Sequence, residues 1–297
     1  MGRMNRMDNS IKRINKIKTK KIIADTIYHV LLIVLCLFFI FPFLYMFFMS
    51  FMTDRESLGN PAIVLIPRNG WQFSNYLYAV DKSFIKSLLN SLTIIVVNLI
   101  TVPFAAMLCA FGFTRCFFKG RDLVFSAVLA TIMLPSMVIQ IPLYVLYVKL
   151  GWINTLYPLI IPAACGGGAM NIFLAKQFMR GIPSSYDEAA VIDGATRFDV
   201  FTKIYLPLSR PIIVFIMIGV FNGTWNDFMN PLMYLRKEST YTLALDVYYK
   251  FSGQMTDGKF PNIQMATGVL LIIPAAIVFF IFQKQLIDGI NIGGLKG

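Results

Sequence analysis

The chain has 297 residues, of which 57% are hydrophobic and 14% are charged, and its mean hydropathy of +0.66 is too high for a soluble domain of this size. The net charge of +12 does not indicate nucleic-acid binding, because the basic residues flank apolar runs and do not line one amphipathic element. The four cysteines have no paired short spacing, which excludes the usual disulfide framework and zinc-site patterns. We therefore expect an all-α integral membrane protein that holds no metal.

The chain begins with a basic segment, residues 1–24, in which Asp8 is the only acidic residue. Such a segment is typical of the cytoplasmic side of a membrane. Residues 25–83 are predicted to form a first transmembrane helix, bent near Pro42, and an outer loop. The apolar run of residues 27–51 is long enough to span a bilayer and too long for the core of a signal peptide.

Residues 84–284 are predicted to form the rest of the membrane-embedded core. Its spans are expected at residues 84–113, 123–148, 157–178, 211–235 and 263–282. Two prolines, Pro135 and Pro142, predict that the third span is broken inside a helix bundle, where neighbouring helices can satisfy the freed carbonyl groups. Three glycines at 166–168 predict close packing or local unwinding in the fourth span.

Six spans place both termini in the cytoplasm, with residues 285–297 as a cytoplasmic tail. The distribution of positive charge supports this orientation, because the segments expected inside carry twice as many Lys and Arg residues as those expected outside. The polar stretch of residues 181–210, between the fourth and fifth spans, is therefore predicted to face the cytoplasm.

This polar stretch contains two helix-start signals. Ser185 with Glu188 and Thr196 with Asp199 each have the spacing of a capping box. Gly194 between them is suited to end a helix. The sequence thus predicts one short helix starting after Ser185 and a second helix after Thr196, separated by a sharp bend.

The same stretch resembles the EAA loop of permease subunits of ABC importers. The resemblance rests on residue identity and spacing at Glu188, Ala189, Ala190, Gly194, Ile204, Leu206 and Pro207. In that family the loop contains the coupling helix, which sits in a cleft of the ATP-hydrolysing subunit. The resemblance implies that these seven residues, called here the predicted coupling residues, dock an ATPase, and we call residues 181–210 the coupling loop.

The resemblance narrows outside the coupling loop to MalG-like permeases of carbohydrate ABC importers, the binding-protein-dependent inner membrane components. It covers about residues 80–297 and rests also on Asn171-Ile-Phe-Leu, Trp225-Asn-Asp-Phe, Tyr241-Thr-Leu-Ala and the glycine-rich end after Gly289. It implies the type I importer permease fold in a bacterial cytoplasmic membrane. It also implies a heterodimer with a MalF-like subunit, together with two ATP-binding subunits and an extracytoplasmic solute-binding protein.

The implied cargo is an oligosaccharide, a disaccharide or a related polyol. The chain lacks the pattern G-x-x-x-x-G-K-[ST], so ATP and Mg are expected to be used by the partner ATPase, with no cofactor bound here. No Ser/His/Asp set or metal-ligand cluster indicates an enzyme. Membrane lipid is the other expected partner.

Polar and aromatic residues within the spans are candidates for the substrate pathway. They are Asn98, Gln140, Tyr144, Asn171, Asn222, Trp225 and Asn226, with Asn230 beside them. Sugar sites combine aromatic faces with amides, but each residue could instead make an interhelical hydrogen bond worth about 0.6 kcal/mol.

The last outer loop, residues 236–262, is long and rich in aromatic residues, which favours a functional role. By position it resembles the loop that maltose-type permeases insert into the open binding protein. The resemblance implies binding-protein contacts at Lys250, Phe251, Gly253, Gly258 and Phe260. An interfacial helix is the alternative.

The tail after Gly289 resembles the MalG-type extension that reaches between the two ATPase subunits, with a frayed terminus as the alternative. A secondary transporter or channel is the alternative function for the whole chain. That function needs ionisable groups on a path through the membrane. Asp227, near the outer end of the fifth span, is the only acidic residue well inside a predicted span. The sequence therefore offers too few ionisable groups for an ion path through the membrane. A membrane scaffold would not explain the proline-broken spans.

Overall fold

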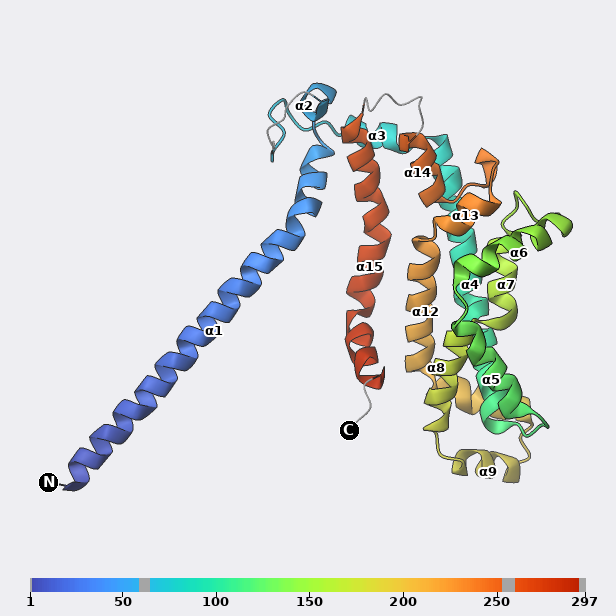
Figure 1. Cartoon of the computed structure of the whole chain (residues 1–297), viewed down its shortest axis with the longest axis horizontal. Helices are drawn as coiled ribbons and strands as arrows, with labels where there is room; N and C mark the ends of the chain where they lie inside the picture. The colour runs from blue at the N-terminus through green and yellow to red at the C-terminus, as the bar shows by residue number, and fades with distance from the viewer. Residues whose placement is uncertain (1, 59–64, 253–259, 294–297) are drawn as a thin grey trace. The chain divides into compact units, whose positions relative to one another are not determined.

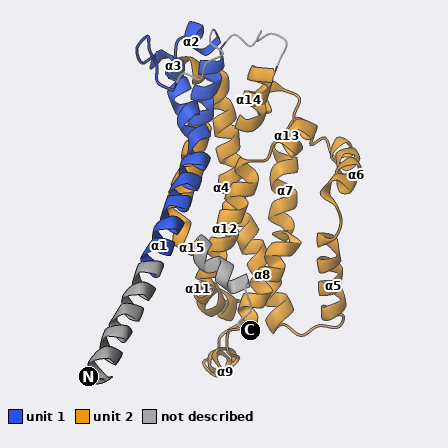
Figure 2. Cartoon of the chain, turned by 60° about the vertical axis from the view of Figure 1, so that its left-hand side comes forward, with its two compact units in different colours: residues 1–76, 259–269 blue, residues 77–258, 270–297 orange. Residues whose placement is uncertain are grey.

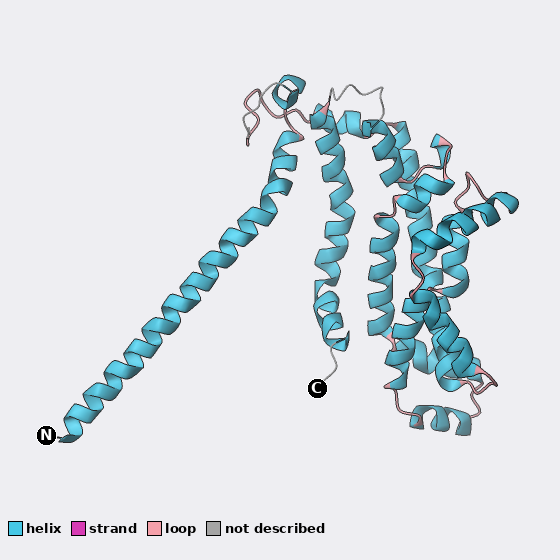
Figure 3. Ribbon diagram, in the orientation of Figure 1, coloured by secondary structure: helices cyan, strands magenta, loops and turns pink. Residues whose placement is uncertain are grey.

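The computed structural model describes residues 2–58, 65–252 and 260–293, and these residues form helices and connecting turns without a β-strand (Figure 3). Two compact units are distinguished (Figure 2). Unit 1 contains Met1–Tyr76 and Lys259–Val269, and unit 2 contains Leu77–Gly258 and Leu270–Gly297. The sequence-based division into four consecutive segments does not anticipate a unit assembled from both ends of the chain.

Unit 1 is built on α1 (Gly2–Met49), followed by α2 (Asp54–Leu58) and the start of α3 (Ser74–Ala79). Helix α1 runs without interruption from the basic segment into the apolar run, and its candidate membrane span is Lys21–Met49. Two buried amides hold the turn that follows α1. Asn75 donates to the carbonyls of Ser50 and Met52, both at 2.9 Å, and Asn262 donates to that of Met52 at 3.0 Å.

Unit 2 is organised around α4 (Lys82–Arg115), against which α7 (Tyr157–Gly166), α8 (Ala169–Arg180) and α12 (Arg210–Trp225) pack (Figure 1). Asp81 caps α4 by accepting from the N–H of Phe84 at 2.8 Å. One core cluster joins the C-terminal parts of α4 and α8 and the start of α12 to the coupling loop. It includes Met107, Phe111, Met179, Phe201, Tyr205 and Ile216.

Two of the expected breaks are present. The third predicted span is divided into α5 (Arg121–Ile132) and α6 (Ser136–Lys149), which are bent by 102° at the residues around Pro135. Gly167 and Gly168 separate α7 from α8, with φ of +66° and +82°. A Cβ on Gly167 would lie 2.5 Å from the backbone nitrogen of Ala106, so the glycine permits both the unwinding and the close approach to α4.

The fifth predicted span, residues 211–235, is too long. Helix α12 ends at Trp225, and a separate helix, α13 (Met229–Tyr234), follows. Asp227 gives the physical reason for the break, because its carboxylate accepts from the backbone N–H of Asn230 at 3.2 Å and thereby starts a new turn. Apolar composition alone does not predict this side-chain hydrogen bond, which replaces the helical pattern after Trp225.

The outer connection and the tail also differ from expectation. Residues 236–262 contain a short 3₁₀-helix, η2 (Glu238–Thr240), and α14 (Leu243–Ser252), so the described part of this loop is largely helical. Helix α15 (Pro261–Gly293) continues past the predicted end of the sixth span and includes much of the expected tail. Residues 253–259 and 294–297, including Gly253 and Gly258, lie outside the described residues.

Among the described residues, four helical segments are long and apolar enough to cross a membrane. They are Lys21–Met49, Lys82–Arg115, Tyr157–Arg180 and Pro261–Gln285. Two further pairs qualify only as bent spans: α5 with α6, and Arg197–Leu208 with α12, the latter bent by 76°. The structure therefore agrees with six spans when each bent pair counts as one.

Candidate functional site

The coupling loop forms the end of unit 2 opposite α14 (Figure 1), and its first helix is α9 (Ser185–Ile192). The predicted capping box at Ser185 and Glu188 is wrong. The helix starts one residue early, with Ser184 already in an αR conformation and its carbonyl accepting from the N–H groups of Asp187 and Glu188. Ser185 is therefore inside the first turn, where its side chain cannot cap the helix.

The predicted bend at Gly194 is present. Gly194 has φ of +78°, and Ala195 donates to the carbonyl of Ala190 at 2.9 Å while Gly194 donates to that of Val191 at 3.1 Å. These two hydrogen bonds form a Schellman motif, the usual way to end a helix at a left-handed glycine. The loop thus leaves α9 in a defined direction.

The second helical stretch begins as predicted with a capping box at Thr196 and Asp199. It comprises α10 (Arg197–Asp199), a π-helical segment, η1 (Val200–Tyr205), and α11 (Leu206–Leu208). Lys203 pairs with Asp199 at 2.6 Å, and this contact, with the Thr196 hydrogen bonds, lowers the pKa of Asp199 to about 2. The carboxylate stays ionised and holds the start of the helix at physiological pH.

The predicted coupling residues divide between two faces. Glu188, Ala189, Gly194 and Pro207 are exposed, whereas Ala190 is buried and Ile204 and Leu206 pack against the core cluster. The exposed face also carries apolar side chains that sequence reasoning did not single out. Val191, Ile192 and Phe198 are 58%, 85% and 63% exposed. An apolar face of this kind beside a carboxylate can dock a partner protein.

A buried polar cluster anchors α9 to α4, and sequence reasoning missed it. Arg115, the last residue of α4, donates to the backbone carbonyls of Ile182 and Met179, and its Nε lies 3.5 Å from Oδ2 of Asp187. Its guanidinium also lies 5.1 Å from the ring centre of the fully buried Tyr205. One side chain therefore links the inner end of α4 to both halves of the coupling loop.

Burial, which leaves the Tyr205 hydroxyl without a hydrogen-bond partner among the described residues, raises the pKa of that phenol far above the ordinary tyrosine value. The phenol is therefore neutral at every physiological pH, and the positive charge of Arg115 is balanced by the carboxylate of Asp187. The sequence contained one usable signal, a basic residue at the end of a predicted span, but positive charge at that position is ordinary in membrane proteins.

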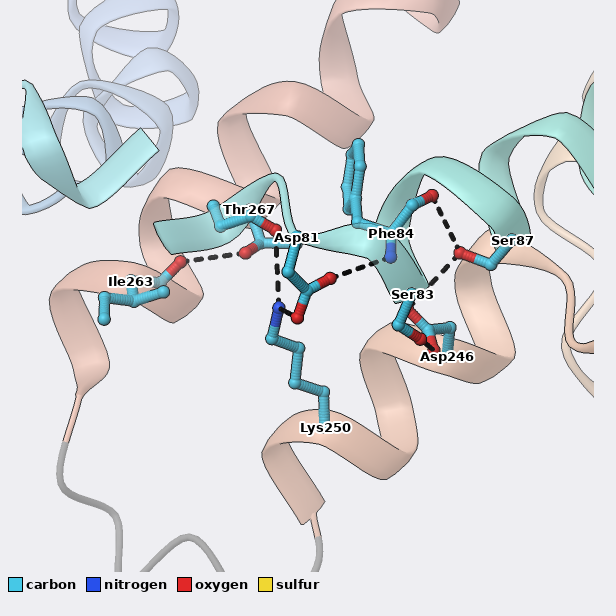
Figure 4. Close-up of polar contacts among 9 residues, drawn as sticks. Asp81, Ser83, Phe84, Ser87, Asp246, Lys250, Ile263 and Thr267 are labelled. Atoms are coloured by element: carbon cyan, nitrogen blue, oxygen red, sulfur yellow. Dashed lines mark hydrogen bonds and ion pairs between the residues drawn. The ribbon is translucent and has the colours of Figure 1, made fainter. Parts of the chain in front are cut away.

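A second polar cluster lies at the other end of unit 2, where α14 contacts the start of α4 (Figure 4). Lys250 pairs with Asp81 at 2.7 Å, and the buried Asp246 accepts hydrogen bonds from Ser83 at 2.5 Å and Ser87 at 3.3 Å. Burial opposes ionisation of Asp81, but the contact with Lys250 and the hydrogen bond from the N–H of Phe84 together outweigh it and lower the pKa of that carboxyl. We call this cluster of Asp81, Ser83, Ser87, Asp246 and Lys250 the α14 clamp. It includes Lys250, which was predicted to contact a binding protein.

The other predicted binding-protein residues near α14 are partly described. Phe251 is half-buried at the end of α14, and Phe260 is 44% exposed just before α15. Gly253 and Gly258 lie outside the described residues, so the proposed tip of the loop stays a prediction.

The predicted substrate-pathway residues do not converge on one point. Asn98 donates to the carbonyl of Leu159 at 3.1 Å, Asn171 donates to that of Gly167 at 2.7 Å, and Trp225 donates to that of Leu271 at 3.2 Å. These contacts between or within helices are the alternative role considered for them. Their part in a pathway stays a prediction.

The remaining four pathway candidates make weaker or more exposed contacts. Gln140 lies 3.5 Å from the side-chain oxygen of Asn230, and Tyr144 accepts from Arg236 at 3.0 Å. Asn226 donates to the carbonyl of Asn222 at 2.9 Å on the exposed end of α12. No common cavity contains these four side chains among the described residues that line pockets.

Residues 102–291 match the family described as "Binding-protein-dependent transport system inner membrane component". The chain is 30% identical to the arabinooligosaccharides transport system permease protein AraQ of Halalkalibacterium halodurans, over 87% of this chain and 91% of that protein. It is also 30% identical to the trehalose/maltose transport system permease protein MalG of Thermococcus litoralis, over 90% of this chain and 94% of that protein.

The fold is similar to a chain in a crystal structure of a bacterial ABC transporter involved in the import of the acidic polysaccharide alginate. The TM-score is 0.78 at 24% sequence identity, and the match covers 88% of this chain and 96% of that chain. At this level of identity the likeness establishes the fold of the chain and leaves its cargo open.

Proposed function

Because this chain belongs to the family of binding-protein-dependent transport system inner membrane components, we propose that it forms half of the translocation pathway of an ATP-driven carbohydrate importer. The chain is a multi-pass protein of the cytoplasmic membrane and a transport subunit, not an enzyme. The proposed cargo is an oligosaccharide or disaccharide, since the relatives named above are permeases for arabinooligosaccharides and for trehalose or maltose.

The observation that carries the proposal is the geometry of α9. A short helix, ended by the Schellman motif at Gly194, projects an exposed carboxylate, Glu188, next to the exposed apolar side chains of Val191 and Ile192. Its opposite face is held by Ala190 in the core cluster and by the contact between Asp187 and Arg115. A rigid helix with one free apolar face is suited to transmit force from a docked partner to α4.

The arrangement of α9 and the family membership support a proposed set of partners. A second permease subunit of the MalF type completes the pathway, two ATP-binding subunits dock on the α9 faces of the two permease chains, and a solute-binding protein delivers the carbohydrate outside. ATP and Mg bind to the ATPase subunits. The work of transport therefore reaches this chain as mechanical movement of α9.

Binding-protein-stimulated ATP hydrolysis of the reconstituted complex tests the proposal. Ala189→Arg places a bulky charge on the exposed face of α9 without disturbing the core, and Ile192→Arg does so at the most exposed apolar position of that face. Both should abolish stimulation and reduce co-purification of the ATPase. Ala190→Arg and Gly194→Pro should uncouple as well, but Ala190 is buried and its variant would also disturb packing.

The matched control is Asn69→Arg, which adds the same charge on the predicted outer loop at an exposed position. It should leave stimulation intact. Normal stimulation in both Ala189→Arg and Ile192→Arg, with the complex fully assembled, would exclude α9 as the coupling element.

A further inference from the structure

A cavity of about 300 Å³ lies inside unit 2, bounded by α4, α6, α7, α12 and α13. This volume is at the lower end of the range for small-molecule sites and is large enough for one sugar ring. Its apolar walls include the buried Tyr147 and Tyr234, whose ring centres are 5.1 Å apart, and Pro158 at the start of α7.

The polar groups on the cavity wall are incompletely satisfied. Asn98 is 4% exposed, and its amide donates to Leu159 while its side-chain oxygen has no hydrogen-bond partner among the described residues. Thr242 is 6% exposed, and its hydroxyl likewise has none there. Buried polar atoms without partners are uncommon in folded proteins, so each calls for a water or ligand.

The third polar group is the carboxylate of Asp227. It accepts from the backbone N–H of Asn230 at 3.2 Å and from the Asn230 side chain at 2.9 Å, which leaves acceptor capacity free on both oxygens. None of the described residues that line the cavity is Lys, Arg or His. The carboxylate therefore has no cation beside it on the cavity wall.

These groups define the chemistry of a ligand. The oxygen of Asn98 and the carboxylate of Asp227 accept hydrogen bonds, and the hydroxyl of Thr242 can do either, so the ligand must supply O–H donors. A ligand carboxylate would meet Asp227 in a partly buried setting without a compensating cation, which is strongly unfavourable. The side chains of Tyr147, Tyr234 and Pro158 on the cavity wall can pack against the C–H faces of a sugar ring.

We propose that this cavity binds one uncharged sugar ring of the carbohydrate cargo and excludes uronic acids. The inference takes the carbohydrate nature of the cargo from the proposed function and adds that the bound sugar ring carries no charge. Asn98, Asp227 and Thr242 are the specificity-determining residues, and the subunit thereby contributes a cargo site of its own.

The test is saturation-transfer difference NMR on the full chain, assembled with its partner permease in lipid nanodiscs without ATPase or binding protein. Two matched probe pairs, glucose with glucuronate and galactose with galacturonate, differ only in the carboxylate. At least one neutral sugar should bind, with an affinity at least about ten-fold above that of its uronate. Thr242→Val should weaken this binding about five-fold, the usual effect of one hydrogen bond.

Thr93→Val is the matched control, because Thr93 lies on the exposed side of α4 with its hydroxyl bonded to Leu89. It should bind as the unmodified chain does. Asp227→Asn should narrow the difference between each sugar and its uronate. Equal binding of both members of a pair, binding of neither neutral sugar, or equal affinities of Thr242→Val and Thr93→Val would each overturn the proposal. None of these results affects ATPase coupling through α9, which the hydrolysis assay measures separately.

Discussion

Arg115 is the residue on which the two halves of the coupling loop depend. Its guanidinium satisfies two backbone carbonyls near the end of α8, lies beside Asp187 of α9, and packs over the ring of Tyr205. Removing it would leave a carboxylate and two carbonyl groups in a mostly buried setting. Such losses cost about 1–3 kcal/mol for each unsatisfied group.

We expect Arg115→Gln to lower the apparent melting temperature of the assembled complex and to reduce stimulated ATP hydrolysis at least ten-fold. Arg115→Lys should recover part of the stability, because it restores the charge next to Asp187 but not the two-pronged hydrogen bonding. Thermal unfolding and stimulated hydrolysis are measured on the same samples. If Arg115→Gln hydrolyses ATP like the unmodified complex, the cluster does not transmit movement to α4.

Residue-level prediction from sequence succeeded where the interaction is local. The capping box of Thr196 and Asp199 lies within four residues, and the structure contains it. The similar pattern at Ser185 failed because the backbone at Ser184 was already helical, which no spacing rule reports. The Arg115 cluster joins residues from α4, α8, α9 and η1, so no sequence window contains it.

At the scale of elements, the break between α7 and α8 offers a matched test of a glycine. A side chain at Gly167 would be strained by the left-handed backbone and would press on the backbone of Ala106 on α4. The strain alone costs about 1–2 kcal/mol. Gly167→Ala should therefore lower the melting temperature clearly.

Gly166→Ala is the control for that substitution. Gly166 is next in sequence, lies at the end of α7, and a Cβ there would have open space around it. This variant should melt at or slightly above the temperature of the unmodified chain, since alanine favours a helix over glycine. Equal melting temperatures for the two variants would show that the close approach of Gly167 to α4 contributes nothing to stability.

The outer connection gives a second test at this scale. Helix α14 is clamped to α4 by Lys250 with Asp81 and by Asp246 with two serines, and residues 253–259 follow directly. Replacing residues 252–258 by a Gly/Ser linker should abolish uptake and stimulation by the loaded binding protein, while basal ATP hydrolysis persists. Unchanged uptake would exclude this segment as the element that displaces the carbohydrate.

Elements were predictable from sequence where composition alone determines them. The long apolar runs that became α4 and α15 were located, as were breaks at Pro135 and at the three glycines. The end of α12 was missed, and a helix in the region of α14 was considered only as the alternative to a loop. The end of α12 depends on Asp227, whose carboxylate accepts a backbone hydrogen bond that starts a new turn. The position of α14 depends on Asp246, which accepts hydrogen bonds from two serines of α4.

At the scale of the whole molecule, the proposed function depends on α9 and on the α14 clamp, which lie at opposite ends of unit 2 with α4 between them (Figure 1). The spans and the orientation followed from hydropathy and charge, since the bilayer constrains them strongly. The cavity was not predicted, because it combines residues from several helices. Of these residues, the sequence singled out Asn98 for the substrate pathway, with Asn230 beside it, and Asp227 only as a group on a possible ion path. A secondary transporter remains the rival function, and it predicts a different energy source.

Uptake of labelled carbohydrate by proteoliposomes tests the central claim most directly. The vesicles contain the complete complex, with the solute-binding protein and a neutral oligosaccharide outside, and either ATP with Mg or an imposed proton or sodium gradient supplies the energy. Uptake should require enclosed ATP, should be unaffected by collapsing both gradients, and should be lost in Ala189→Arg. Uptake that proceeds on an ion gradient without ATP would contradict the assignment of this chain as an ATP-driven permease subunit.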